Sequence, residues 1–292
     1  MRAITIGKQM LSWGSQTYVM GVLNITPDSF SGDGIMNNSD AVDAAVEQAR
    51  RFLSDGADIL DIGGESTRPG STPLESQEEL DRVMPVIQAL VAQFPGLLMS
   101  IDTYKSRVAE AAFKVGVQIL NDVWALRADP DLAALAAQYE AIVVLMHNRS
   151  DPKSIQVRDR LGNAYHGADY QDLMEDVKRE LMQSVQIARE AGIPDSHIIL
   201  DPGVGFGKTR EQNLELINRL GEIRALGYPV LLGPSRKSFI GYTLDLPPDQ
   251  RLEGTAAAAA VGIVRGADIL RVHDVRAIVR LAKMTDAILR AG

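Results

Sequence analysis

The sequence predicts a single (β/α)8 TIM barrel, and three observations lead to this fold class. Eight short apolar runs alternate with longer segments of helical periodicity, as in parallel strands joined by helices. No linker or low-complexity segment divides the chain. Its 292 residues fit the usual size of one barrel. We therefore predict one domain over residues 1–292, with residues 1–17 as an extension at the barrel base. A doubly wound open sheet is the alternative.

The predicted strands are nearly continuous apolar runs, as expected for parallel strands that are buried on both faces. In chain order they are Tyr18–Leu23, Ile59–Ile62, Leu97–Ile101, Gln118–Leu120, Ile142–Met146, His197–Leu200, Val230–Leu232 and Ile269–Val272.

The helices between these runs are predicted from apolar residues at three- to four-residue spacing. The first follows Ser39 and ends before Gly56, because glycine suits a left-handed helix cap. Five further helices are predicted over Tyr104–Val115, Pro130–Tyr139, Tyr170–Ala191, Arg251–Val264 and Asp274–Leu289.

Two other helices are predicted from capping boxes, in which the first and fourth residues satisfy each other's backbone amides. Ser76 and Glu79 form one such pair, and Thr209 and Gln212 form the second. Pro85 lies in the helix that follows Ser76, and it predicts either a kink or a later start.

The composition excludes several classes of function. A net charge of −8 argues against a nucleic-acid or anionic-membrane binder, although a small anionic ligand is compatible with it. No signal peptide or membrane-spanning run is evident. The absence of cysteine removes disulfides, zinc–thiolate sites and cysteine nucleophiles, and it fits a reducing cytoplasm. We therefore expect a cytoplasmic protein with small-molecule partners.

Polar residues follow every predicted strand. In a barrel these positions meet at the C-terminal face, where such enzymes have their active sites. A single Asp or Asn there is equally well explained as a helix cap or turn former, but this series ends eight apolar runs in turn. Its members are Asn24, Asp61, Asp102, Asn121-Asp122, His147-Asn148, Asp201, Gly233–Ser238 and Arg271–Asp274.

The charges in this series predict the kind of ligand. Lys237 and Arg271 follow the seventh and eighth strands, where barrels often bind phosphate. Aspartates at strand ends suit a ligand that presents paired N–H donors. The expected ligand is therefore a polar heterocycle joined to an anion. The other predicted cations at this face are Arg68, Arg236 and His273.

No histidine cluster predicts a metal or nucleophile site. His147, His166 and His197 are interpreted as structural or solvated, since His166 lies in a long polar loop and His197 lies at a strand start. The sequence shows no zinc-ligand spacing and no Ser/His/Asp arrangement.

The stretch DPGVGFGKT at Asp201–Thr209 imitates a nucleotide-binding loop. A Walker loop requires glycine where the chain has Pro202, and a dinucleotide fingerprint requires glycine where the chain has Lys208. The stretch is therefore interpreted as a glycine-rich turn that matches neither motif.

Eight segments, in order, resemble the dihydropteroate synthase family over essentially the whole chain. They are MGVLNITPDSFSGDG at 20–34, DIGGESTRPG at 61–70, SIDTYK at 100–105, ILNDV at 119–123, DPGVGFGKT at 201–209, GPSRKSFIG at 233–241, RLEGTAA at 251–257 and RVHD at 271–274. The resemblance implies a TIM-barrel transferase of folate biosynthesis. Such an enzyme condenses 6-hydroxymethyl-7,8-dihydropterin pyrophosphate with 4-aminobenzoate, with Mg²⁺ as cofactor, and it is implied to be a homodimer.

The resemblance also implies a role for individual residues. Asp102, Asn121 and Asp201 would read the pterin ring, Lys237 would donate to its carbonyl or ring nitrogen, and Met146 would line its pocket. The remaining roles concern the anion and the second substrate. They are Mg²⁺ ligation by Asn24, pyrophosphate binding by Arg271 and His273, approach to the phosphates or amine by Thr67 and Arg68, carboxylate binding by Ser238, and packing by Phe30, Pro69 and Phe206. Asp102, Asp201, Lys237, Arg271 and His273 form the implied catalytic set.

One departure from the family pattern lies in the first lid. The family reads Ser-Phe-Ser-Asp-Gly-Gly, whereas this chain has its acidic residue one position later, at Asp33. Two alternatives are a pterin-binding methyltransferase and a catalytically silent homologue. Asn24, the two lids, Ser235–Ser238 and Arg271–His273 together argue against the methyltransferase, which would need no pyrophosphate-binding residues. The presence of Asn24, Lys237 and Arg271 argues against the silent homologue.

Overall fold

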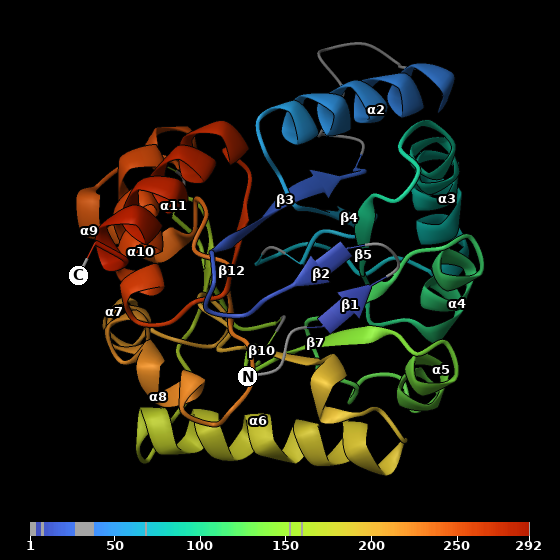
Figure 1. Cartoon of the computed structure of the whole chain (residues 1–292). Helices are drawn as coiled ribbons and strands as arrows, with labels where there is room; N and C mark the ends of the chain where they lie inside the picture. The colour runs from blue at the N-terminus through green and yellow to red at the C-terminus, as the bar shows by residue number, and fades with distance from the viewer. Residues whose placement is uncertain are drawn as a thin grey trace.

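Eight parallel strands form the centre of the molecule in the computed structural model, which describes residues 4–6, 9–26, 38–67, 69–151, 153–158 and 160–291. Each strand pairs in parallel with its neighbours (Figure 1). The strands are β3 (Tyr18–Asn24), β4 (Ile59–Gly63), β5 (Leu98–Asp102), β6 (Ile119–Asp122), β7 (Ile142–Met146), β10 (Ile198–Asp201), β11 (Leu231–Leu232) and β12 (Ile269–Val272).

The two edge strands of this sheet contact each other, and this contact distinguishes a closed barrel from an open sheet. The hydrogen-bonded order is β10-β7-β6-β5-β4-β3-β12-β11. The terminal strands β10 and β11 are joined by a parallel bridge between Leu200 and Val230. The amide of Leu200 also donates to the carbonyl of Pro229 at 2.9 Å. The predicted (β/α)8 barrel is therefore confirmed, and the open-sheet alternative is wrong.

Helices surround the barrel on its outside (Figure 1). Their apolar faces pack with the outward-facing strand residues in one continuous core. They are α2 (Asn38–Ser54), α3 (Ser76–Gln93), α4 (Ser106–Lys114), α5 (Leu132–Gln138), α6 (Leu173–Glu190), α7 (Arg210–Asn218), α8 (Leu220–Arg224), α9 (Ser238–Leu244), α10 (Leu252–Val264) and α11 (Val275–Leu289). Within the described part of the chain, none of them combines the length and apolar character that a membrane crossing requires.

Most predicted helix ends agree with the structure, and the differences have local causes. The Thr209–Gln212 capping box is confirmed, with the Thr209 amide 2.8 Å from Gln212 Oε1. Gly56 has a left-handed φ of +98° after α2, as predicted for a C-cap. The helix predicted from Tyr170 begins at Leu173, because Asp172 accepts the first amides of α6.

The capping box predicted at Ser76 and Glu79 is wrong. Helix α3 begins at Ser76 with Glu75 as its N-cap residue. Glu79 is buried, and its carboxylate contacts the ammonium of Lys105. A capping bond contributes about 1 kcal/mol, whereas a buried carboxylate without a partner costs more. The expected late start at Pro85 does not occur either, since Pro85 lies inside the helix.

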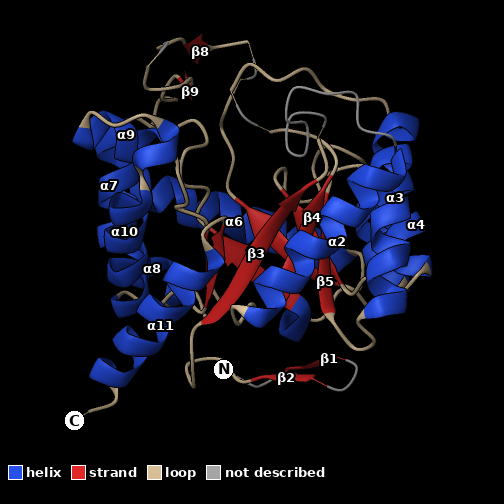
Figure 2. Ribbon diagram, turned by 90° about the horizontal axis from the view of Figure 1, so that it is seen from above, coloured by secondary structure: helices blue, strands red, loops and turns tan. Residues whose placement is uncertain are grey.

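A short hairpin lies at the N-terminal end of the barrel. It consists of β1 (Ile4–Ile6) and β2 (Gln9–Leu11), paired antiparallel. Ile4, Ile6 and Leu11 pack into one apolar cluster with the lower interior residues of the strands. Figure 2 shows this hairpin opposite the end that carries β8 and β9.

The alternation of side chains along the strands places the polar site above an apolar floor. The lower interior layer is formed by Met20, Ile59, Leu98, Ile119, Ile142, Val144, Ile199, Leu231 and Ile269. Side chains two residues apart share a face of a strand, so the next interior positions face the same cavity higher up. Those positions include Asp61, Ser100, Asn121, Met146, Asp201 and Arg271. The apolar floor therefore ends where the polar layer begins.

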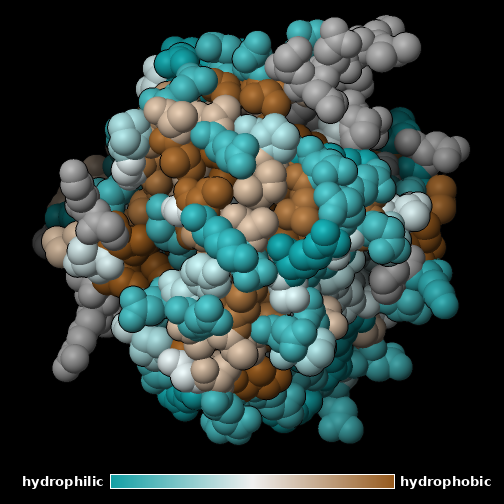
Figure 3. Space-filling model, turned by 90° about the vertical axis from the view of Figure 1, so that its right-hand side faces the viewer, coloured by the Kyte–Doolittle hydropathy of each residue, from teal (hydrophilic) through white to brown (hydrophobic). Residues whose placement is uncertain are grey.

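The outer surface over α3, α4 and α5 is mixed in character (Figure 3). Apolar residues appear there in small groups that polar residues separate. A different face carries exposed apolar side chains on two adjacent helices, namely Val261 and Val264 on α10 and Met284 and Ile288 on α11.

Candidate active site

Arg271 links two carboxylates at the C-terminal face of the barrel. Its Nε lies 2.5 Å from Asp61 Oδ2, and its Nη2 lies 2.5 Å from Asp102 Oδ2. Asn121 Nδ2 donates to the same Asp61 oxygen at 3.0 Å. Four strands thus converge through their side chains on one cluster. The sequence marked Asp61 as polar but gave it no role.

Burial and neighbouring charges shift the pKa values of this cluster in opposite directions. Burial raises the pKa of Asp102 to about 7, because the lowering effect of Arg271 is opposed by Asp61 and other nearby carboxylates. Burial acts to lower the pKa of Arg271, but Asp61 and Asp102 more than reverse this effect. Asp61 is 0% exposed, and its Oδ1 has no hydrogen-bond partner among the described residues. The cluster therefore retains acceptor capacity inside the barrel.

A second polar pair lies across the barrel on β10 and after β11. Asp201 is buried, and its Oδ1 accepts the amide of Gly203 at 2.7 Å. Burial raises the pKa of Asp201, while the charge of Lys237 acts to lower it. Burial lowers the pKa of Lys237 to about 8, against the opposing effect of Asp201. The Lys237 ammonium donates to the carbonyl of Val204 and lies 4.6 Å from the centroid of the Phe206 ring.

The loop after β10 is glycine-rich because it passes very close to the chain after β7. Gly203 has a φ of +70°, and a Cβ there would lie 1.8 Å from the carbonyl oxygen of His147. A Cβ on Gly207, whose φ is +65°, would lie 2.5 Å from the carbonyl carbon of Arg149. Both positions exclude side chains. The predicted glycine-rich turn is confirmed, and its packing against residues 147–149 explains the glycines.

A hairpin that the sequence did not reveal stands over this face. It consists of β8 (Ile155–Gln156) and β9 (Ala164–Tyr165), beyond the C-terminal ends of the strands (Figure 2). Tyr165 Oη donates to the carbonyl of Thr67 at 3.0 Å, and Asn163 Nδ2 lies 3.4 Å from the carbonyl of Pro69. Two-residue strands carry no periodic signal, so the sequence could not predict them.

A pocket of about 380 Å³ lies between this hairpin and the first residues of α7 and α9. Arg158, Tyr165 and Tyr242 line it from the sides, and Ser238 lines it from the start of α9. The pocket therefore adjoins the predicted carboxylate-binding residue.

The comparison with known proteins decides the family. A family model described as "Pterin binding enzyme" matches residues 20–273. The dihydropteroate synthase of Clostridium beijerinckii is 47% identical over 286 residues, which cover 98% of this chain and 99% of that protein. The chain belongs to the dihydropteroate synthase family.

Other members of the dihydropteroate synthase family agree in sequence and fold. The Bacillus subtilis enzyme is 48% identical, with 97% of this chain and 92% of that protein covered. The crystal structure of the Clostridium difficile dihydropteroate synthase in the presence of pteroic acid has a TM-score of 0.85 at 48% identity, covering 95% of this chain and 98% of that chain. That of Xanthomonas albilineans with 4-aminobenzoic acid has a TM-score of 0.88 at 40% identity, covering 99% of both chains.

In this dihydropteroate synthase, most residues predicted for the site meet at one end of the barrel. Asn24 is the last residue of β3, and Met146 ends β7 beside Asp201 in the strand register. Ser238 begins α9. The backbone amide and Nδ1 of His273 lie 3.2 and 3.0 Å from Ser235 Oγ. Phe30, Asp33 and Arg68 lie outside the described residues.

Proposed function

We propose that this dihydropteroate synthase binds the pterin ring between its two polar clusters. Asp102 and Asn121 stand on one side, and Asp201 and Lys237 stand on the other. The observation that carries the assignment is the convergence of two buried carboxylates, an amide and two cations above an apolar floor. Carboxylates accept the N–H donors of the aminopyrimidine edge, and Lys237 donates to the ring carbonyl or a ring nitrogen.

Arg271 and His273 are proposed to hold the pyrophosphate. Arg271 Nη2 donates to Asp102 in this structure. If N–H groups of the pterin donate to Asp102 instead, Nη2 becomes available for the pyrophosphate. A guanidinium presents a planar set of donors that suits phosphate oxygens. Charge developing on the departing pyrophosphate would then be met by fixed donors.

Magnesium is proposed to bind at Asn24. Among the described residues, no three acidic or histidine side chains lie close enough together to hold a metal ion. The amide oxygen of Asn24 fits Mg²⁺, which commonly takes few protein ligands and fills its sphere with water and phosphate oxygens. When bound, the ion would neutralise charge on the pyrophosphate.

The reaction joins the aminobenzoate nitrogen to the pterin methylene carbon, as the bond from that carbon to pyrophosphate breaks. The amine loses one proton to the surroundings. Asp102 and Asp201 keep the ring electron-rich, which favours a carbocation-like methylene. Thr67 and Pro69 belong to the loop that covers the second substrate, and exclusion of water protects the cation from hydrolysis.

This function is tested by mixing the purified protein with dihydropterin pyrophosphate, 4-aminobenzoate and Mg²⁺. Pyrophosphate and dihydropteroate are expected in equal amounts, and both should disappear after chelation with EDTA or omission of 4-aminobenzoate. Pterin binding without product would favour a silent homologue. Turnover that required a corrinoid partner would favour a methyltransferase.

The affinity for the pterin substrate is expected to depend on pH with two limbs. Below about pH 7, Asp102 gains a proton and loses acceptor capacity, so the affinity falls as the pH is lowered. Above about pH 8, Lys237 loses its charge, so the affinity falls as the pH is raised. Calorimetric titrations between pH 5.5 and 9.5 should therefore show the tightest binding near pH 7–8, and a flat profile would contradict both assignments.

Replacing Tyr165 with phenylalanine should affect the second substrate alone. The change removes the hydroxyl that holds the Thr67 carbonyl, while the ring stays beside Phe206. Losing one hydrogen bond of about 1 kcal/mol should raise the KM for 4-aminobenzoate about fivefold. Steady-state kinetics should leave the KM for the pterin unchanged. Tyr228→Phe, which removes a hydroxyl bound by Arg189 below β11, is the matched control.

The protein is also proposed to be a homodimer and to be located in the cytoplasm. The exposed apolar side chains Val264, Met284 and Ile288 lie on the adjacent helices α10 and α11, and a second copy of the chain would cover them. Light scattering after gel filtration should give twice the chain mass, and Met284→Glu should shift the protein toward the monomer. The acidic charge and the absence of cysteine fit a cytoplasmic location.

A further inference from the structure

Lys208 is a buried lysine that the proposed reaction does not use. The residue is 4% exposed, and its ammonium contacts no carboxylate in the part of the chain that the structure describes. Nζ lies 2.9 Å from the carbonyl oxygen of Gly203, 3.1 Å from that of Phe206 and 3.0 Å from Nδ1 of His147. An ammonium has three donors, and each has one acceptor here. Burial lowers the pKa of Lys208 to about 7, so keeping the charged form buried is costly and this arrangement needs a reason.

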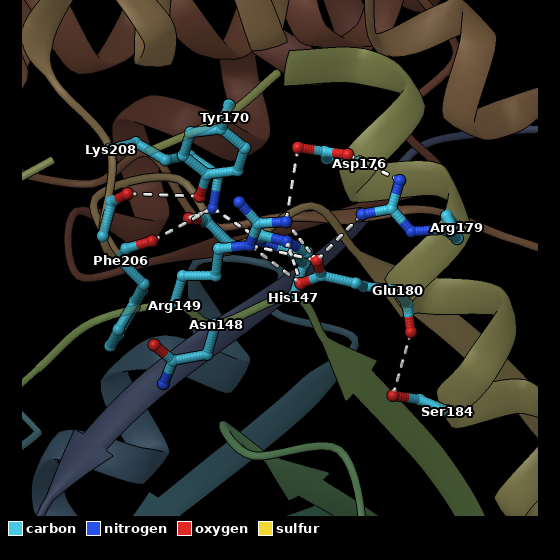
Figure 4. A network of polar contacts seen from close by, with 12 residues as sticks. His147, Asn148, Arg149, Tyr170, Asp176, Arg179, Glu180, Ser184, Phe206 and Lys208 are labelled. Atoms are coloured by element: carbon cyan, nitrogen blue, oxygen red, sulfur yellow. Dashed lines mark hydrogen bonds and ion pairs between the residues drawn. The ribbon is translucent and has the colours of Figure 1, made fainter. Parts of the chain in front are cut away.

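His147 is held in the form that accepts from Lys208. Burial, followed by the charge of Lys208, lowers the pKa of His147 to about 4, so the ring is neutral. Since Nδ1 faces the ammonium, the ring proton belongs on Nε2; this atom lies 3.0 Å from Oε2 of Glu180, although the angle is unfavourable for a hydrogen bond. Arg149 Nε contacts both oxygens of Glu180 at 3.0 and 3.1 Å. Figure 4 shows this chain of side chains from helix α6 to Lys208.

The carbonyl groups that Lys208 holds belong to the loop that carries the proposed pterin contacts. Gly203 accepts from Lys208 through its oxygen and donates through its amide to Asp201 Oδ1 at 2.7 Å. The next residue, Val204, accepts the ammonium of Lys237. One tight turn, only two residues beyond Asp201, therefore orients both Asp201 and Lys237.

We propose that Lys208 is a positioning residue for pterin recognition: its ammonium fixes the Gly203–Phe206 turn against His147 and so orients Asp201 and Lys237. The proposal rests on the pterin assignment made above. It also explains why the stretch imitates a phosphate loop. In a Walker loop the lysine binds a phosphate of the ligand, whereas here it binds carbonyls of its own turn.

The first test replaces Lys208 with methionine, which is unbranched and only one atom shorter, and which removes every donor. The dissociation constant of 6-hydroxymethyl-7,8-dihydropterin pyrophosphate is measured by calorimetry, and the KM for 4-aminobenzoate by kinetics. The pterin Kd should rise about tenfold or more, while the KM for 4-aminobenzoate stays within about twofold. Val279→Ala, a core change where α11 packs near Gly56, controls for general destabilisation and should leave the pterin Kd unchanged.

A second pair of variants decides the question if Lys208→Met does not fold. In His147→Asn the side-chain oxygen takes the place of Nδ1, whereas in His147→Gln the terminal amide takes the place of Nε2. The asparagine variant should keep a pterin Kd near that of the wild type, and the glutamine variant should weaken it.

Three outcomes would overturn the proposal. They are a folded Lys208→Met protein with wild-type pterin affinity, equal pterin affinities in the two His147 variants, and equal losses for both substrates. Failure of the proposed function is distinguishable from these. Wild-type protein that bound the pterin without forming dihydropteroate would refute the synthase assignment, yet the Kd comparison would still decide the role of Lys208.

Discussion

Replacing Asp201 with asparagine is expected to weaken binding of dihydropterin pyrophosphate by about 1.5–3 kcal/mol, or about 10- to 150-fold in Kd. The buried carboxylate already accepts the amide of Gly203 through Oδ1. Asparagine has one oxygen and one NH2 group in place of two acceptors. If its oxygen takes the Gly203 amide, its NH2 group meets the N–H donors of the pterin. If the amide flips, Gly203 loses its acceptor.

Calorimetry without 4-aminobenzoate measures this effect directly. Asp195→Asn is a matched control, because Asp195 forms an exposed ion pair with Arg189 before β10, at the opposite end of the barrel. The control should bind the pterin as the wild type does. A Kd for Asp201→Asn within twofold of the wild-type value would show that Asp201 does not read the pterin ring.

The strands and their polar ends were predictable because each signal is local. Buried parallel strands are short apolar runs, and a polar residue that ends such a run is visible without knowledge of its neighbours. Asp102, Asn121 and Asp201 could therefore be named from the sequence, and the structure places all three facing the barrel interior. The identity of the ligand came from the family resemblance, since no spacing of these residues specifies a pterin.

The unpredicted features depend on contacts between distant parts of the chain. Arg271 and Asp61 are separated by 210 positions, and the pairing of β3 with both β12 and β4 brings them together. The two-residue period along β4 did place Asp61 on the same face as Ile59, which was the available signal. Glu79 fits a local capping motif equally well, but Lys105 offers it a buried partner that the local sequence does not reveal.

Replacing Arg271 with methionine is expected to be the most damaging of these changes. It leaves the carboxylates of Asp61 and Asp102 without the cation that joins them. Removing one member of a buried ion pair typically costs about 3–5 kcal/mol in the free energy of unfolding. Loss of a donor to the departing pyrophosphate should in addition lower kcat by about 100-fold or more. Urea unfolding and single-turnover kinetics measure the two effects separately.

The stability deficit of Arg271→Met should itself depend on pH. Without the guanidinium, the pKa of Asp102 rises further above about 7, so the folded variant binds a proton that the unfolded chain releases near its ordinary value of 3.8. Where the folded state binds more protons, stability falls as the pH rises. The deficit should therefore be largest at pH 8 and smaller at pH 5. A deficit of equal size at both values would contradict a loss caused by unpaired carboxylates.

A second substitution separates folding from catalysis at the same cluster. Asp61→Asn in the Arg271→Met background replaces the fully buried carboxylate with a neutral amide of the same shape. It should restore most of the lost stability, because no unpaired charge remains at that position. It should not restore kcat, because the guanidinium proposed to meet the pyrophosphate is still absent. Recovery of both would mean that Arg271 acts only by holding the barrel end together, and that the leaving group is stabilised by other residues.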